Sequence, residues 1–269
     1  MTTGKRNFLL TVVAILVLFG LSFVVQDGVD TSIRRIINLC LIYAIIGLSM
    51  NITNGFAGQF SLGQAGFMAI GAYMVGIFTV PVNLRADVFY AVPMNPYLVN
   101  IYMPLWLALI LGGLLAALVA GLIGTPVLRL RGDYLAIATL GFSEIIRIII
   151  TNANTITNGA LGIKNIPSLN DVRYIFLATA VAYVLISLLL SSSYGRAFKA
   201  IREDEIAAEA MGIDLFHHKN MAFMVSAFFA GIGGGLYGAL LGTVDPKNFL
   251  FTLTYNFLLI IVLGGMGSI

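Results

Sequence analysis

Long apolar runs alternate with short polar segments along the whole chain. Such a run must hold about 20 residues to cross the hydrocarbon of a bilayer as a helix. A membrane β-barrel would instead show segments of about ten residues that alternate in polarity, and these runs do not alternate. The pattern therefore predicts an all-α, polytopic transmembrane helical bundle of about eight spans that forms a single domain over residues 1–269. The runs are residues 8–25, 33–50, 63–80, 103–128, 134–150, 174–190, 221–241 and 250–263.

Composition agrees with a membrane location. Hydrophobic residues make up 59% of the chain and charged residues 10%, against about 25% charged residues in a soluble domain. The net charge of +3 is spread over loops without a dense basic run, which favours a lipid bilayer and not nucleic acid as the partner. Cys40 is the single cysteine, so no intrachain disulfide forms, and no metal-binding spacing is present.

The distribution of charge predicts the orientation. Lys5 and Arg6 precede a run that is longer than the core of a signal peptide, so we expect a retained first helix. A cytoplasmic N-terminus places eight Lys and Arg residues inside and six outside, with the most basic segment, 196–219, inside. Tyr97, Tyr102 and Trp106 then lie at the outer interface, where aromatic belts occur.

The segment between the second and third runs is polar but carries no charge. Cytoplasmic loops usually carry Lys or Arg, whereas a Gly-, Asn- and Gln-rich stretch suits backbone that leaves helical form beside a protein-lined cavity. The alternative is a short uncharged turn. The candidates for a translocation path in this segment are Asn51, Asn54, Gln59, Ser61 and Gln64.

Two charged residues fall inside the fifth run. Glu144 and Arg147 are three residues apart and so share a helix face. Charges near the bilayer midplane are costly unless they are paired or hydrated, which predicts that both face the bundle interior. They could form an ion pair that orients helices, or contribute to a gate or pathway.

Small residues recur every fourth position in two of the runs. They are Gly112, Ala116, Ala120 and Gly124 in one, and Gly231, Gly235, Gly234, Gly238 and Gly242 in the other. Such faces allow helix backbones to approach closely, either within this chain or against a second transmembrane subunit.

Residues 195–214 between the sixth and seventh runs are helical in composition. Apolar side chains occupy one side, charges cover the other, and Gly212 suits the helix end. The segment is either an amphipathic helix on the membrane surface or a docking helix for a cytoplasmic protein.

Together these segments resemble the branched-chain amino-acid ABC transporter permeases of the LivM type. The family pattern G-x-x-G-Q-x-S-L-G-x-A-x-F-x-x-I-G-A-Y is matched by residues 55–73, and R-G-x-Y-x-A-x-x-T-L-x-x-x-E-I-I-R by residues 131–147. T-x-G-x-x-G-I is matched by residues 157–163, and the G-R-A-x-x-A-I-R-E-x-E-x-A-A-x-A-x-G-I of the ATPase-coupling loop by residues 195–213.

The resemblance implies an import system in a prokaryotic inner membrane. A substrate-binding protein would dock outside, a second homologous permease would pack beside this one, and two cytoplasmic ATPases would drive transport of branched-chain amino acids. The family continues beyond a G-G-x-G-S motif, so we expect a chain ending at Ile269 to be truncated. The implied coupling residues are Gly195, Arg196, Ala197, Ala200, Ile201, Arg202, Glu203, Ala207, Ala208, Met211 and Gly212.

Three alternatives compete with this interpretation. Urea and short-amide permeases look similar. A stand-alone secondary transporter would need ion-coupling residues within its spans, and only Glu144 and Arg147 qualify. An enzyme is disfavoured because the sequence holds no catalytic triad, dyad or metal motif. No phosphate-binding G-x-x-x-x-G-K-[ST] loop occurs either, so ATP and Mg²⁺ would be bound by partner subunits and no cofactor by this chain.

Overall fold

The computed structural model describes residues 17–130 and 132–268, and its regular structure there is helical. An isolated antiparallel bridge joins Ile163 to Val244. The longer helices are α2 (Thr31–Asn51), α3 (Gln64–Thr79), α6 (Leu105–Val127), α7 (Asp133–Asn152), α9 (Val172–Ser191), α10 (Ser193–Glu203), α12 (Leu215–Leu241) and α13 (Phe251–Gly264). The short ones are η1 (Ile52–Phe56), η2 (Val82–Leu84), α4 (Arg85–Val88), α5 (Pro96–Val99), α8 (Asn154–Thr157), η3 (Gly159–Leu161), α11 (Glu205–Ala210) and η4 (Pro246–Phe249).

Five helices in this part of the chain are long and apolar enough to cross a bilayer: α2 with η1 (Thr31–Phe56), α6, α7, α9 and α12. A sixth span results if α3 is counted with Val82–Val88, to which it is bent by 99°. The sequence predicts about eight. The first predicted span extends into residues outside the described range, and the last, α13, has 14 residues, about 21 Å of helix against roughly 30 Å of hydrocarbon.

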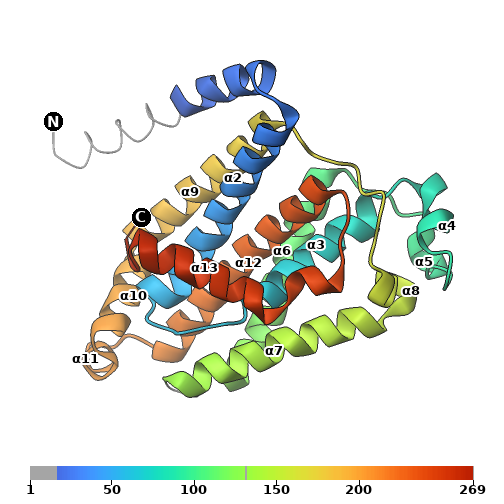
Figure 1. The fold of residues 1–269 in the computed structure, drawn as a ribbon. Coiled ribbons are helices and arrows are strands. Elements are labelled where there is room, and N and C mark those ends of the chain that lie inside the picture. The colour runs from blue at the N-terminus through green and yellow to red at the C-terminus, as the bar shows by residue number, and fades with distance from the viewer. Residues whose placement is uncertain (1–16, 131, 269) are drawn as a thin grey trace.

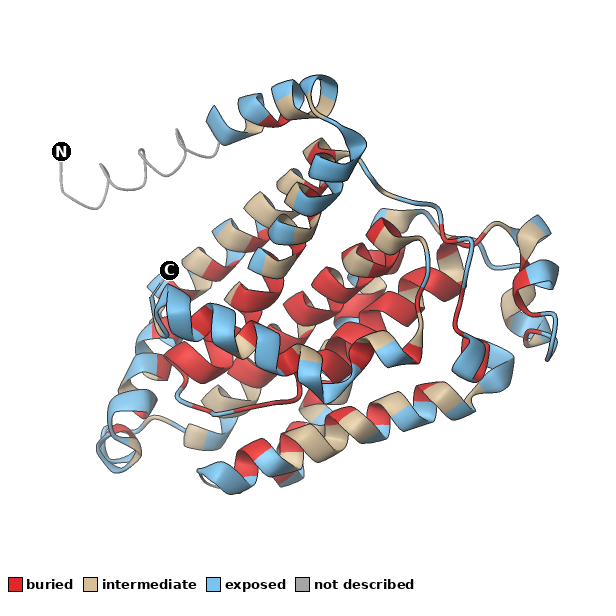
Figure 2. Cartoon of the chain, in the orientation of Figure 1, coloured by how far each residue is buried: buried red, intermediate tan, exposed pale blue. Residues whose placement is uncertain are grey.

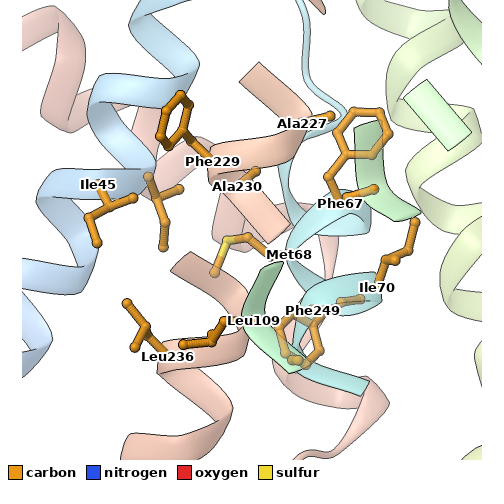
Figure 3. Packing of buried hydrophobic residues seen from close by; sticks show 14 of the residues in the cluster. Ile45, Phe67, Met68, Ile70, Leu109, Ala227, Phe229, Ala230, Leu236 and Phe249 are labelled. Atoms are coloured by element: carbon orange, nitrogen blue, oxygen red, sulfur yellow. The ribbon is translucent and has the colours of Figure 1, made fainter. Parts of the chain in front are cut away.

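Helices α3 and α12 form the centre of the bundle, as the buried surfaces in Figure 2 show. Phe67 and Met68 of α3 pack with Ala227 and Ala230 of α12 and with Leu109 of α6 (Figure 3). The outward faces of α6, α7 and α9 carry exposed Leu, Ile and Val side chains, as expected for helices that face lipid.

Glycines set how closely the central helices approach. A Cβ atom added to Gly71 would lie 1.8 Å from the carbonyl oxygen of Gly231, and one added to Gly234 would lie 2.1 Å from that of Met68. Gly112 of α6 likewise lies against the backbone of Gly71. Of the two alternatives for the small-residue faces, the structure therefore shows packing within this chain for these glycines.

The connections gather at two ends of the bundle (Figure 1). One end holds η1, the α6–α7 turn, α10 and α11; the other holds residues 81–104 and 153–171 and the α12–α13 connection. We call these the coupling end and the distal end. At the coupling end, Gly124 near the end of α6 lies against Asn220 near the start of α12. At the distal end, Met103 N before α6 donates to Phe78 O in the last turn of α3.

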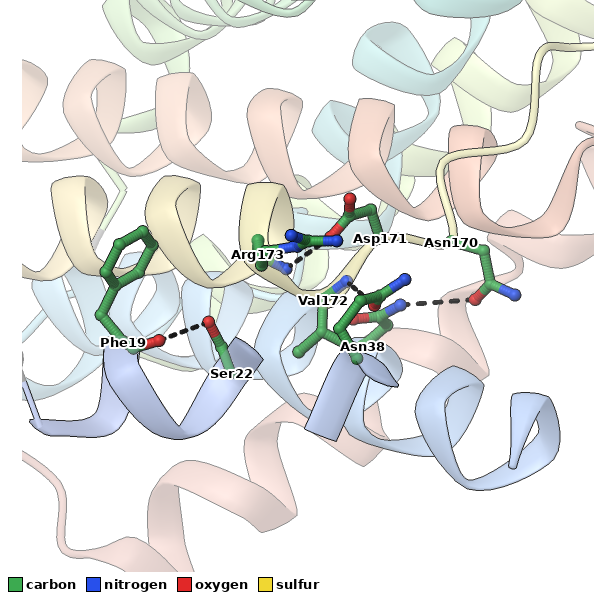
Figure 4. Close-up of polar contacts among 8 residues, drawn as sticks. Phe19, Ser22, Asn38, Asn170, Asp171, Val172 and Arg173 are labelled. Atoms are coloured by element: carbon green, nitrogen blue, oxygen red, sulfur yellow. Dashed lines mark hydrogen bonds and ion pairs between the residues drawn. The ribbon is translucent and has the colours of Figure 1, made fainter. Parts of the chain in front are cut away.

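Polar contacts fasten the distal end. Figure 4 shows Asn38 of α2 donating to Asn170 at 3.4 Å and Arg173 pairing with Asp171 at 3.2 Å, where α9 begins beside α2. The motif at residues 157–163 forms a tight turn in which Asn158 has φ +60° and its side chain donates to the carbonyls of Val88 and Gly162.

Arg85 lies in the connection between α3 and α6, yet it is buried, with 2% of its surface exposed. Its guanidinium donates to four backbone carbonyl oxygens, those of Val80, Leu98, Val99 and Ile101, at 2.5–3.1 Å. The fork of donors thus ties both ends of the 81–101 segment together.

Candidate functional site

The backbone of α2 changes form at its end. After Asn51 it continues as one π-helical turn, Ile52–Phe56, and residues 58–63 then run without regular structure to the start of α3. Gly58 turns the chain with φ +65°. The expected departure from α-helix in this uncharged stretch is confirmed, and π-helical turns occur often at functional sites.

Buried side chains brace this segment from within. Asn54 donates to Ser61 O and accepts from Ser61 N, both at 3.2 Å. Leu62 N donates to the hydroxyl of Thr139 on α7 at 2.9 Å. The loop is therefore attached both to α2 and to α7, which fixes its path through the bundle.

Gln64 links the start of α3 to two further helices. Its Nε2 donates to the hydroxyl of Ser49 on α2 at 2.5 Å, and the hydroxyl of Ser226 on α12 donates to Ser49 O at 2.7 Å. Gln59 differs from these neighbours. It is buried, yet neither of its side-chain polar atoms has a hydrogen-bond partner in the described part of the chain.

Asn51 contacts the segment that follows α13. Its Nδ2 donates to Ser268 O at 2.7 Å, and its Oδ1 accepts from Gly267 N at 2.9 Å. The side chain thus joins the end of α2 to residues 267–268. Among the five uncharged candidates, only the side chain of Gln59 has no hydrogen-bond partner in the part of the chain that the structure describes.

Glu144 and Arg147 form the ion pair that their spacing predicts. The Nε of Arg147 lies 2.7 Å from Oε2 of Glu144, and both side chains are about three-quarters buried. The second carboxylate oxygen, Oε1, is buried and has no partner in the described chain. The pair neutralises both charges within α7, so neither requires a partner on another helix.

The predicted coupling segment is helical but is not one helix. α10 ends at Glu203 and α11 begins at Glu205, because Asp204 is extended and its carboxylate caps α11 by accepting from Ile206 N and Ala207 N. Gly212 ends the segment with φ +83°, as the sequence predicts. Met211, one of the coupling residues that the resemblance implies, is 82% exposed.

A close turn holds α10 against the end of α9. A Cβ atom on Gly195 would lie 2.2 Å from the carbonyl oxygen of Leu190, so a side chain does not fit there without displacing the backbone. Phe198 and Ile201 of α10 are buried, whereas Ile206 of α11 and Met211, which follows α11, are exposed.

The coupling segment and the polar segment meet. Arg202 of α10 donates to Gly55 O in η1 at 3.0 Å, and the Lys199 ammonium lies 5.5 Å from the centre of the Phe56 ring. Arg202 and Gly55 are 147 residues apart in the sequence, and only the fold brings them together.

Comparisons with known proteins show the family of the chain. Residues 32–269 match the family model described as "Branched-chain amino acid transport system / permease component". The chain belongs to this permease family. The permease is 38% identical to the high-affinity branched-chain amino acid transport system permease protein LivM of Escherichia coli over 99% of its own length.

More distant relatives carry other names. A probable branched-chain amino acid transport permease protein LivM of Methanocaldococcus jannaschii is 29% identical, covering 84% of this permease and 73% of that protein. The nucleoside ABC transporter permease protein NupC of Lactococcus lactis is 24% identical, covering 78% and 69%. The permease spans about 65% of the length of the LivM proteins of E. coli and Salmonella typhimurium. No solved structure matches it.

The polar site of the permease includes residues that sequence reasoning did not select. Ser49, Thr139 and Ser226 accept or donate the hydrogen bonds that anchor the 57–64 segment. Each is a Ser or Thr within an apolar run. Such hydroxyls often bond only to the backbone of their own helix, so nothing in the sequence indicated that these three link helices.

Proposed function

We propose that this chain is a permease subunit of an ABC importer that moves branched-chain amino acids into a prokaryotic cell. The observation that carries the proposal is its 38% identity, along nearly its whole length, to relatives named as LivM. The chain would form part of the translocation path for the amino acid and would catalyse no reaction. ATP and Mg²⁺ would be bound and used by partner subunits.

The partners follow from the two ends of the bundle. Two cytoplasmic ATPases would serve the pair of permeases. The exposed apolar side chains of Ile206 on α11 and of Met211 directly after it support docking there. A second homologous permease would pack beside this one, and a substrate-binding protein would dock on the distal end. In this arrangement the coupling end and the N-terminus lie in the cytoplasm. The chain would then cross the membrane eight times, with the N-terminal segment as the first crossing and α13 as the last.

The translocation path would run beside the segment that follows α2. Gln59 supports this placement, because it is buried and both of its polar side-chain atoms are available to a solute or water. Asn51, Asn54, Ser61 and Gln64 would shape the path by bracing the backbone. Glu144 and Arg147 would flank the path from α7.

Reconstitution tests the function directly. The full-length permease, its partner permease and both ATPases are reconstituted in proteoliposomes, and the binding protein is added on the opposite side from the ATPases. Transport of radiolabelled leucine is measured with ATP, or with a non-hydrolysable analogue, on the side of the membrane that the ATPases face. We expect leucine uptake only with ATP, with no competition by urea or guanosine. Uptake driven by an ion gradient without ATPases, or uptake of urea or guanosine alone, would contradict the proposal.

A further inference from the structure

Arg202 in the last turn of α10 reaches out of the coupling segment to the break in α2. Its Nη1 donates to Gly55 O at 3.0 Å. Its Nε and Nη2 contact Oε1 of the neighbouring Glu203 at 3.1 and 2.5 Å. The guanidinium therefore uses one edge to fix its orientation and the other to bind η1.

The carbonyl it binds lies where a helix ends. The last carbonyls of a helix have no partner within it and need a donor from elsewhere. Arg202 supplies that donor to Gly55 from a helix about 150 residues later in sequence.

Close packing keeps the two segments together. A Cβ atom on Gly58 would lie 3.0–3.2 Å from Cγ, Cα and Cβ of Arg202. The ammonium of Lys199 covers the Phe56 ring on the same side of η1. With so little free space, α10 cannot move toward η1 without displacing it, and a movement away would break the hydrogen bond from Arg202 to Gly55 O.

From η1 the contacts continue toward α7. Asn54 of η1 holds Ser61 through two hydrogen bonds, and the next residue, Leu62, donates to Thr139. A displacement of η1 would therefore reach the whole 57–63 segment, including Gln59.

We propose that Arg202 is a positioning residue that transmits movement of α10 to the π-helical turn of α2 and thereby to residues 57–63. This inference rests on the proposed function, because it assumes that ATPases move α10. In this proposal Arg202 acts through its hydrogen bond to Gly55 O and not by binding solute or ATPase.

The test uses the complete importer in proteoliposomes with Arg202→Gln and Gly58→Ala. Arg202→Gln removes the charged donor, and Gly58→Ala retains Arg202 but forces it away from η1. In both variants we expect the ATPases to co-purify as with the wild type, while the amount of leucine transported per ATP hydrolysed falls about tenfold. Arg202→Lys, which keeps one cationic donor, should recover part of the ratio.

Two variants control for loss of a charge and for backbone strain. Arg129→Gln removes an exposed arginine beside the α6–α7 turn. Gly132→Ala strains a glycine with φ +56° that has no atom within 4 Å of an added Cβ. Both should keep the wild-type ratio of leucine to ATP.

The outcomes are distinguishable. An unchanged ratio in Arg202→Gln, or in Gly58→Ala, would overturn the inference and leave the proposed function intact. Loss of ATPase co-purification in Arg202→Gln would also overturn it, since Arg202 would then be a docking contact. Failure of the wild-type importer to move leucine with ATP would overturn both.

Discussion

At the scale of single residues, the polar side chains of this bundle act mainly on backbone. Asn54, Thr139 and Arg85 each bind main-chain groups that irregular segments leave without a helical partner. In hydrocarbon or in the buried interior of the protein no water replaces such a bond, so each irregular segment needs its own side-chain partners.

Arg85→Lys tests this principle at the distal end. Lysine offers one ammonium in place of a fork and cannot reach all four carbonyl oxygens. We expect the permease to lose about 2 kcal/mol of stability and the 81–101 segment to exchange its amide hydrogens faster. Thermal unfolding in detergent and hydrogen–deuterium exchange measure the two effects.

The matched change is Arg129→Lys, at an exposed arginine, which should alter neither quantity. Unchanged exchange at 81–101 in Arg85→Lys would show that other contacts hold the segment.

At the scale of elements, helix α3 depends on backbone contact more than on large side chains. It is buried on nearly all sides, and its glycines lie against α6, α7 and α12. Within lipid the hydrophobic effect does not drive helices together, because the lipid tails are as apolar as the side chains. Dispersion contacts between closely approaching backbones stabilise the association instead.

Gly71→Ala should therefore separate α3 from α12. The new methyl would meet the carbonyl of Gly231, which is backbone and cannot rotate aside, so we expect a loss of at least ~2 kcal/mol as a lower midpoint of thermal unfolding. Gly141→Ala on α7 has no atom within 4 Å of its added Cβ and should leave the midpoint unchanged or raise it slightly. Equal midpoints for the two variants would refute this account of the crossing.

At the scale of the whole molecule, the bundle has two chemically different ends. The coupling end carries the exposed side chains of Ile206 on α11 and of Met211 directly after it. The distal end carries the segment 81–101, which Arg85 holds and in which Tyr97 is exposed. A membrane between them would place each end in a different compartment.

Cysteine labelling tests the proposed orientation in a chain expressed without its partners. Native Cys40 is first replaced by serine, and Met211→Cys or Tyr97→Cys is added at positions that are 82% and 87% exposed. We expect an impermeant maleimide to label position 97 from outside intact spheroplasts and position 211 only in inside-out vesicles. The reverse pattern would invert the topology.

Much of this architecture was predictable from local pattern. Apolar runs predicted the all-helical class because lipid forces backbone bonds to close within each segment. The uncharged Gly- and Asn-rich stretch after Asn51 predicted broken helix, and the spacing of Glu144 and Arg147 predicted an ion pair, since both depend on near neighbours in sequence.

Only the tertiary structure decided what those segments contact. The length criterion alone could not separate α3, a buried helix bent at its end, from a straight crossing, because burial depends on the neighbouring helices. The break at Asp204 and the bond between Arg202 and Gly55 were likewise hidden in the sequence. Periodicity reports which face of a helix is apolar, whereas the joining of α10 to α2 depends on how helices distant in the chain pack together.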